Sequence, residues 1–141
     1  MASVVKYDSG TSHIIPAQEG AGQTFKKSDL LKFTSGQVVI ATAGAIDAIA
    51  QADASGTTSA TIAIEPIEFD QVYMASYKAS ATAQTLVGAL VDFTFTAGAH
   101  TLDESGATTD ALCIALDPRD AVATSGGRLL IMFMPGATVR A

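Results

Sequence analysis

Residues 30–40 read LLKFTSGQVVI, and this stretch decides the expected fold. Leu30–Phe33 and Gln37–Ile40 are apolar and β-branched runs of strand length, and Ser35-Gly36 between them is a turn signal. The stretch therefore predicts a β-hairpin. Further runs typical of short strands follow at Ile46–Ala50, Thr61–Ile64 and Phe69–Tyr73.

The alanine-rich stretch Ala41–Ala54 has two interpretations. Alanine is the best helix former, so a helix is one of them. Gly44 interrupts the stretch, however, and apolar residues do not recur with the 3.6-residue period of a helix. We therefore expect strand there, and we expect a short helical turn at Ala79–Leu86 instead.

The second half of the chain is similar to the first at offsets that grow from 61 to 69 residues. Small loop insertions between two copies of one β-unit produce such a drift, although chance similarity is the alternative in a sequence this rich in Ala, Thr and Gly. The matches pair Gln23–Phe25 with Gln84–Leu86, Phe33–Gly36 with Phe95–Gly98, Ile49-Ala50 with Ile114-Ala115, and Ile62–Pro66 with Leu129–Pro135.

These observations predict a mainly β protein made of small β-barrel or β-sandwich units. The expected division is an extended N-terminal arm over residues 1–22, a first β-unit over residues 23–78 and a second β-unit over residues 79–141. The arm is polar, and Pro16 interrupts its short apolar pieces.

Composition limits the classes of function. Of 141 residues, 48% are hydrophobic and only 16% are charged, so part of the surface is expected to be apolar and covered by other chains. A monomer with a surface of Ala, Ser and Thr is the alternative. Residues 33–118 carry one Lys and ten acids, which argues against binding nucleic acid or anionic membranes.

We expect no signal peptide and no membrane-spanning helix. Residues 1–10 lack the apolar segment of a signal peptide. No run approaches the 18 apolar residues that a membrane-spanning helix needs.

The residue types that carry chemistry are few. Cys113 lies within the apolar run ALCIAL, which predicts a buried, unreactive thiol. His13 and His100 have no metal-ligand spacing with each other or with Cys113, and we expect both to be solvated loop residues. We therefore expect no catalytic residue, no cofactor and no metal.

Acidic residues gather in three places, which are Glu65–Asp70, Asp103–Asp110 and Asp117–Asp120. Solvated turns are the favoured interpretation, because Asp hydrogen-bonds readily to its own backbone. No segment fits the EF-hand pattern, although a weak Ca²⁺ site stays open.

The segment Asp117-Pro118-Arg119-Asp120 predicts a turn with Pro118 at its second position. Arg119 can pair with the flanking acids locally, or it can form a bidentate pair across an interface. Arg128, which follows the Gly126-Gly127 turn, is the second basic residue in this region. Arg119 and Arg128 are therefore candidates for an oligomer interface.

Several stretches resemble the small head-decoration, or cement, proteins of tailed phages, and the resemblance covers most of residues 20–135. They are QTFKKSDLL at 23–31 with GQVV at 36–39, IAQADAS at 49–55, ESGATTDALCIAL at 104–116, DPRDAV at 117–122 and GGRLLIMF at 126–133. These stretches are turn and strand patterns rather than catalytic signatures.

The resemblance implies a non-enzymatic virion protein, made in the host cytoplasm, that binds the outside of the capsid. Such a protein would be a homotrimer that bridges neighbouring subunits of the major capsid protein. Residues 1–17 would grip the capsid by strand addition. The expected capsid contacts are Val4, Val5, Tyr7, Ile14 and Ile15.

Two other classes of protein remain. One is another β-rich virion component, such as a head-fibre base or a tail-tube protein, for which rings of six would be expected. The other is an enzyme or small-molecule binder, which would need polar groups that converge in a pocket, and the sequence offers no such group.

Overall fold

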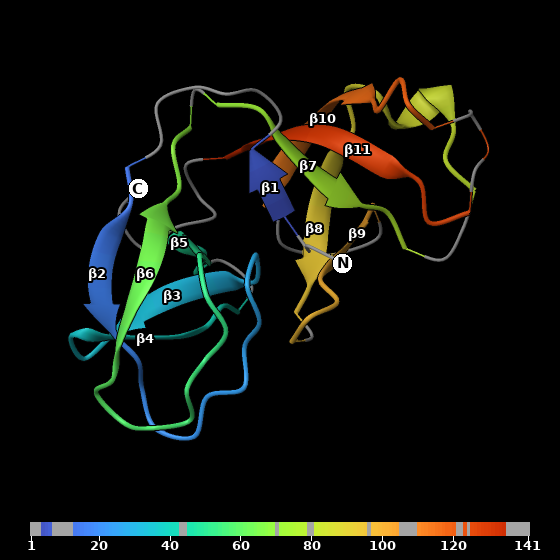
Figure 1. The fold of residues 1–141 in the computed structure, drawn as a ribbon. Coiled ribbons are helices and arrows are strands. Elements are labelled where there is room, and N and C mark those ends of the chain that lie inside the picture. Colours follow the sequence, from blue (N-terminus) through green and yellow to red (C-terminus); the bar gives the residue numbers. More distant parts are fainter. Residues whose placement is uncertain are drawn as a thin grey trace.

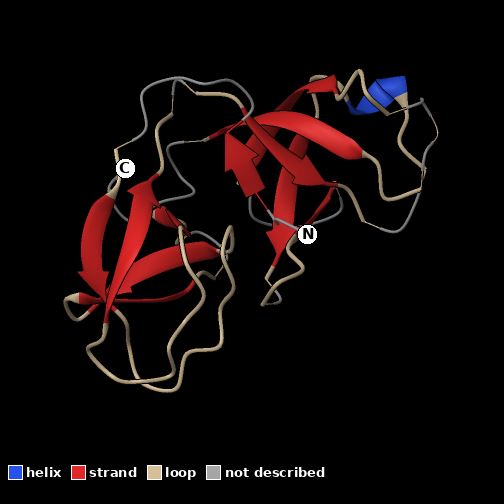
Figure 2. Cartoon of the chain, in the orientation of Figure 1, coloured by secondary structure: helices blue, strands red, loops and turns tan. Residues whose placement is uncertain are grey.

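The computed structural model describes the chain at residues 4–6, 13–42, 45–69, 71–78, 81–95, 97–104, 110–120, 123 and 125–134. The described residues form eleven strands and one short 3₁₀ helix, η1 (Gln84–Leu86), so the prediction of a mainly β fold is confirmed. The strands build two antiparallel sheets that make up two lobes (Figures 1 and 2).

The first sheet lies in the N-terminal half of the chain. Its strands are, in spatial order, β2 (Ile15–Gln18), β6 (Thr61–Pro66), β5 (Ala48–Ala50), β3 (Leu30–Thr34) and β4 (Gln37–Ile40). The second sheet runs in the order β1 (Val4–Lys6), β7 (Tyr73–Ser76), β11 (Arg128–Phe133), β10 (Ala111–Leu116), β8 (Leu90–Thr94) and β9 (Thr101–Asp103).

Each sheet closes on itself through one parallel bridge. In the first sheet Glu19 pairs with Val38, and the Gly20 N–H donates to the Val38 carbonyl at 2.9 Å. In the second sheet Tyr77 pairs with Leu102, and the Lys78 N–H donates to the Leu102 carbonyl at 2.9 Å. Closure satisfies backbone groups that open sheet edges would leave unpaired. We call the two closed units barrel 1 and barrel 2.

The two barrels have the same topology, which confirms the predicted duplication. The order β2-β6-β5-β3-β4 in barrel 1 corresponds strand for strand to β7-β11-β10-β8-β9 in barrel 2. Individual hydrogen bonds repeat as well. The Asp47 N–H donates to Leu31 O at 2.8 Å, and the Asp110 N–H donates to Val91 O at 3.1 Å.

Strand register corrects the residue matches of the repeat. Phe33 lies opposite Val38 and Phe93 lies opposite Leu102, so the counterpart of Phe33 is Phe93 rather than Phe95. The pairs Leu30–Ile49 and Leu90–Leu112 likewise make Leu112, not Ile114, the counterpart of Ile49. The sequence matches are displaced because residues 95–100 separate β8 from β9, whereas only residues 35 and 36 separate β3 from β4.

The pairing also changes the expected boundaries of the units. β7 belongs to barrel 2, although it lies within residues 23–78, and β2 is part of barrel 1. The described strands of the expected arm are therefore built into the two barrels, with β1 lying against β7 (Figure 1). Backbone donors and acceptors of an extended segment need partners, and the neighbouring strands supply them.

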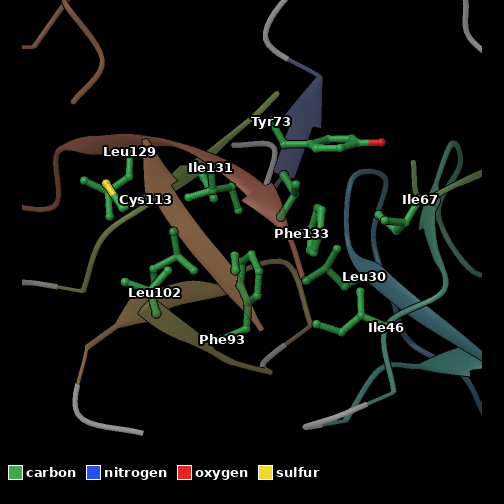
Figure 3. Close-up of a cluster of buried hydrophobic side chains, with 14 of the residues drawn as sticks. Leu30, Ile46, Ile67, Tyr73, Phe93, Leu102, Cys113, Leu129, Ile131 and Phe133 are labelled. Carbon is green, nitrogen blue, oxygen red and sulfur yellow. The ribbon is translucent and has the colours of Figure 1, made fainter. Parts of the chain in front are cut away.

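Two buried clusters hold the molecule together. Phe25, Leu31, Val38, Ile62 and Ile64 belong to the core of barrel 1. The larger cluster fills barrel 2 and continues across the junction, where Leu30 and Ile46 of barrel 1 lie beside Phe133 (Figure 3). Neighbouring residues Leu30 and Leu31 thus serve different cores, because side chains alternate across a strand.

Most of the predicted secondary-structure elements are confirmed. The hairpin is confirmed as β3 and β4, and Ala48–Ala50 is a strand rather than a helix. The expected helical turn is η1, and the strand expected at Phe69–Tyr73 begins at Tyr73 instead. Within the ranges that the structure describes, no helix is long and apolar enough to cross a membrane.

Candidate interaction surfaces

A buried Asp29 and a buried His100 lie between the two barrels. Asp29 Oδ2 accepts hydrogen bonds from the Lys26 N–H at 2.9 Å and from the Gly98 N–H at 2.7 Å. His100 Nε2 accepts a hydrogen bond from the Leu30 N–H at 3.1 Å and lies 3.6 Å from Asp29 Oδ1. Both donors that cross the junction are main-chain groups, so the pair fixes the position of one barrel backbone against the other.

The geometry assigns His100 a neutral ring, because Nε2 must be unprotonated to accept the Leu30 N–H. Burial lowers the pKa of His100, although the nearby Asp29 carboxylate and a hydrogen bond with the Thr94 backbone act in the opposite direction. The expectation of a solvated histidine is therefore wrong for His100. Residues 97–100 fold back against barrel 1, and the Phe95 ring lies edge-on to the imidazole with 5.6 Å between the ring centroids.

His13 agrees with its prediction. Its side chain is largely exposed, and its Nε2 lies 3.6 Å from Glu68 Oε1.

Arg119 and Arg128 each form a two-pronged pair with an aspartate of the same chain. Arg119 donates to Asp117 through Nε at 2.9 Å and Nη2 at 2.6 Å. Arg128 donates to Asp120 through Nε at 2.9 Å and Nη2 at 2.7 Å. The local interpretation of this segment is thereby confirmed. The interface role of the two arginines stays a prediction.

Proton binding in this cluster follows the ion pairs. Hydrogen bonds from Arg119 hold the pKa of the Asp117 carboxyl below its usual value, and burial of Asp117 opposes them. Hydrogen bonds from Arg128 lower the pKa of Asp120 to about 2. Both carboxylates are therefore charged at neutral pH and complement the two guanidinium groups.

The expectation that the acids lie in solvated turns is wrong for Asp110, Asp117 and Glu65, which are buried. The carboxylate of Asp110 has a structural task, since its Oδ2 accepts the Phe93 N–H at 2.9 Å. Asp47 does the same for the counterpart Phe33 at 3.0 Å. The repeated sequence signal is an Asp-Ala pair directly before a strand, at 47–48 and 110–111.

Cys113 is buried, as predicted, and burial raises the pKa of its thiol. A raised pKa leaves little reactive thiolate at neutral pH. Over the described ranges, no group of three or more His, Cys, Asp or Glu side chains is placed to hold a metal ion.

The expected capsid contacts differ in their exposure to solvent. Val4 is fully buried in the cluster at the junction, and its N–H donates to the Ser28 carbonyl at 3.1 Å, so it is not available as a surface anchor. Val5 lies on β1, although its side chain is outside the described part, and Tyr7 is outside the described residues altogether. Ile14 and Ile15 are exposed.

Exposed apolar side chains mark both barrels. Among the described residues, the large hydrophobic side chains with the highest exposure are Ile14 (50%), Ile15 (41%), Phe33 (36%), Val87 (36%) and Leu90 (51%). The first three belong to barrel 1 and the last two to barrel 2. Large apolar groups left in water are typical of surfaces that other molecules cover.

An open groove of about 370 Å³ lies beside Val87 in barrel 2. Its walls come from η1 and from the end of β10 with the turn that follows. The residues that line it are Gln84, Val87, Ile114, Ala115, Leu116, Asp117, Pro118 and Asp120. Its carboxylates, Asp117 and Asp120, already pair with Arg119 and Arg128.

No protein-family model matches the chain, and a search of the curated proteins finds no significant match. The fold and surfaces therefore define the class of protein, which is a tandem pair of closed β-barrels with exposed apolar side chains on each barrel.

Proposed function

We propose that this chain is a structural protein of a tailed-phage virion, which binds the outer surface of the capsid and bridges neighbouring subunits of the major capsid protein. The observation that carries the proposal is the exposure of large apolar side chains on both barrels of a pair that shares one buried cluster. A molecule with two separated contact surfaces on joined barrels is suited to bridging.

The polar groups support the same class of function. Asp29, Asp47 and Asp110 are occupied by main-chain donors, and Asp117 and Asp120 by arginines. These carboxylates stabilise the fold rather than face a substrate. The sequence resemblance to head-decoration proteins gives the proposal its particular setting, the capsid exterior, and its expected assembly, a homotrimer.

The structure revises how the N-terminus would take part. Val4 belongs to the barrel junction and β2 belongs to barrel 1, so the described strands β1 and β2 are parts of the fold. We propose that Ile14 contacts the capsid, because it is the most exposed member of the predicted set among the described residues.

The test uses particles assembled from the major capsid protein encoded beside this chain. We expect the purified protein to co-sediment with expanded particles and to raise the temperature at which they open. Ile14→Asp should weaken binding at least about tenfold, since it places a charge in an apolar contact. Thr57→Asp, on an exposed loop of the same barrel, is the matched control.

Absence of co-sedimentation would overturn the proposal. Electron microscopy of virions carrying a labelled chain provides the second arm. Label on the head supports decoration, whereas label on the tail or on head fibres assigns the chain to another virion component.

A further inference from the structure

Each strand of barrel 1 has a counterpart in barrel 2, yet the two barrels meet through different faces. Barrel 1 contributes residues that point outward from its sheet, chiefly Leu30, Ile46 and Ile49, which we call the outer face. Barrel 2 contributes residues at the mouth of its interior, chiefly Tyr73, Phe93 and Phe133, which we call the open end. The contact is therefore head-to-tail, because the outer face of one barrel meets the open end of the other (Figure 3).

The outer face exists in barrel 2 as well, and there it is uncovered. The cross-strand pair Leu30–Ile49 corresponds to the pair Leu90–Leu112. Leu30 is fully buried, whereas Leu90 is 51% exposed, and Leu112 is only half-buried. Barrel 2 thus presents to solvent the same apolar pair that barrel 1 buries at the junction.

The open end exists in barrel 1 and is uncovered in the same way. Strand register makes Phe33 the counterpart of Phe93, and Ile15 the counterpart of Tyr73. Phe93 and Tyr73 are buried at the junction, whereas Phe33 and Ile15 are exposed.

Three of the five exposed large hydrophobic side chains in the described part of the chain are thus counterparts of junction residues. They are Leu90, Phe33 and Ile15. Scattered surface hydrophobics need no special account, but exposure at positions equivalent to an existing contact indicates a second contact of the same kind.

We propose that the outer face of barrel 2, centred on Leu90 and Leu112, packs against the open end of barrel 1, centred on Phe33 and Ile15, of a second copy of this chain. The contact repeats between chains the arrangement that joins the barrels within one chain. The inference rests on the self-association part of the proposed function and is independent of capsid binding.

A head-to-tail contact has a defined consequence for assembly. Each chain keeps one free face of each kind, so assembly continues until a ring closes or a filament grows. In a ring of three chains, six barrels would alternate between contacts within a chain and contacts between chains.

The contact between chains lacks the polar part of the junction. Ala89 stands at the position of Asp29, as shown by matching hydrogen bonds at 2.9 Å from Ala50 to Asp29 and from Cys113 to Ala89. The Ser35-Gly36 turn replaces the loop that carries His100. The contact between chains is therefore apolar and weaker than the junction, so assembly depends on protein concentration.

The experiment uses the full-length protein and two charge substitutions, Leu90→Asp and Phe33→Asp, with Thr57→Asp as control. Both target side chains are exposed in the single chain, and circular dichroism and thermal melting verify that each variant is folded. Sedimentation equilibrium measures association. We expect the wild type and the control to form a closed oligomer, and each charge variant to associate at least about 100-fold more weakly.

Mixing the two charge variants is the decisive arm. Leu90→Asp retains an intact open end and Phe33→Asp retains an intact outer face, so an equimolar mixture should form a one-to-one heterodimer. A symmetric contact through Leu90 alone would leave Phe33→Asp fully associated. That result, a monomeric wild type, or a mixture that stays monomeric would overturn the inference.

Capsid binding is measured on the same variants, so the two proposals can fail separately. An oligomer that does not bind particles removes the capsid proposal and keeps the contact described here. A monomer that binds particles removes the contact described here and keeps the capsid proposal.

Discussion

His100 Nε2 accepts a hydrogen bond from the main-chain N–H of Leu30, 3.1 Å away, across the junction of two duplicated barrels. The bond joins a side chain of barrel 2 to the backbone of barrel 1 and requires an unprotonated nitrogen. Proton binding by one buried imidazole is therefore linked to the integrity of the junction.

Stability should fall on mild acidification because of His100. Its folded pKa lies below the ordinary value of 6.5, so the unfolded chain binds the proton more readily. The loss begins as pH falls through about 6.5 and continues down to the folded pKa, with a slope of at most about 1.4 kcal/mol per pH unit. Denaturant titrations of the wild type and His100→Asn between pH 5 and pH 8 measure the difference. The same dependence of the unfolding free energy on pH in both proteins would contradict this assignment.

Removing the Asp29 carboxylate should destabilise the fold by about 2–5 kcal/mol, because two main-chain donors lose their acceptor in a buried site. Asp29→Ala is compared with Asp53→Ala, whose carboxylate accepts the exposed Lys27 N–H at 2.8 Å. The control should lose less than about 1 kcal/mol. Chemical denaturation measures both, and equal losses would show that Asp29 has no special role.

The duplicated aspartates provide an internal comparison. Asp110→Ala should cost about 1–3 kcal/mol, because the Phe93 N–H that it satisfies is buried. Asp47→Ala should cost less, since the Phe33 N–H lies in a partly exposed site where water can replace the carboxylate. Asn at position 110 retains an acceptor oxygen and should restore part of the loss. The order of the three unfolding free energies is the readout.

The Asp120–Arg128 pair should stabilise the fold at neutral pH and lose this contribution in acid. The pKa of Asp120 is lowered to about 2 from an ordinary value near 3.8, so its stabilisation is complete above pH 4 and is lost as pH falls from about 4 to 2. Asp120→Asn removes this contribution. Thermal melts at pH 2, 3 and 4 should show a smaller acid-induced shift in the variant than in the wild type.

Truncation of the N-terminus should damage the fold itself. Val4 is fully buried at the junction, and Val4→Ala should cost about 1–2.5 kcal/mol through lost packing. Ile14→Ala, at an exposed position, should change stability by less than about 0.5 kcal/mol. Deletion of residues 1–17 removes β1 and three of the four residues of β2 and should lower the melting temperature. A truncated protein as stable as the wild type would show that these strands are dispensable.

Local signals in the sequence predicted a large part of this fold. The Ser35-Gly36 turn between two β-branched runs defines its hairpin without help from the rest of the chain. The duplication was visible because each unit repeats its strands and turns in the same order. Residue-level matches were displaced, since Phe93-Thr94 and Phe95-Thr96 are equally good matches to Phe33-Thr34 and only strand pairing separates them.

The surfaces were harder to predict because they depend on contacts between distant residues. Nothing local distinguishes Ala97–His100, which folds against the other barrel, from an ordinary solvated turn. Val4 and Ile14 look alike as apolar residues of a polar segment, yet one is buried and the other exposed. Hydrophobicity predicts that a residue will be covered, whereas tertiary pairing decides which surface covers it.

The connection between the barrels is only six residues long, from the end of β6 at Pro66 to the start of β7 at Tyr73. So short a covalent tether holds one barrel near the other at an effective local concentration in the millimolar range. The junction therefore forms in every molecule as soon as the chain folds, however dilute the protein is. A tandem protein in this way acts as a preassembled pair of barrels. Only its association with other molecules depends on how much protein the cell makes.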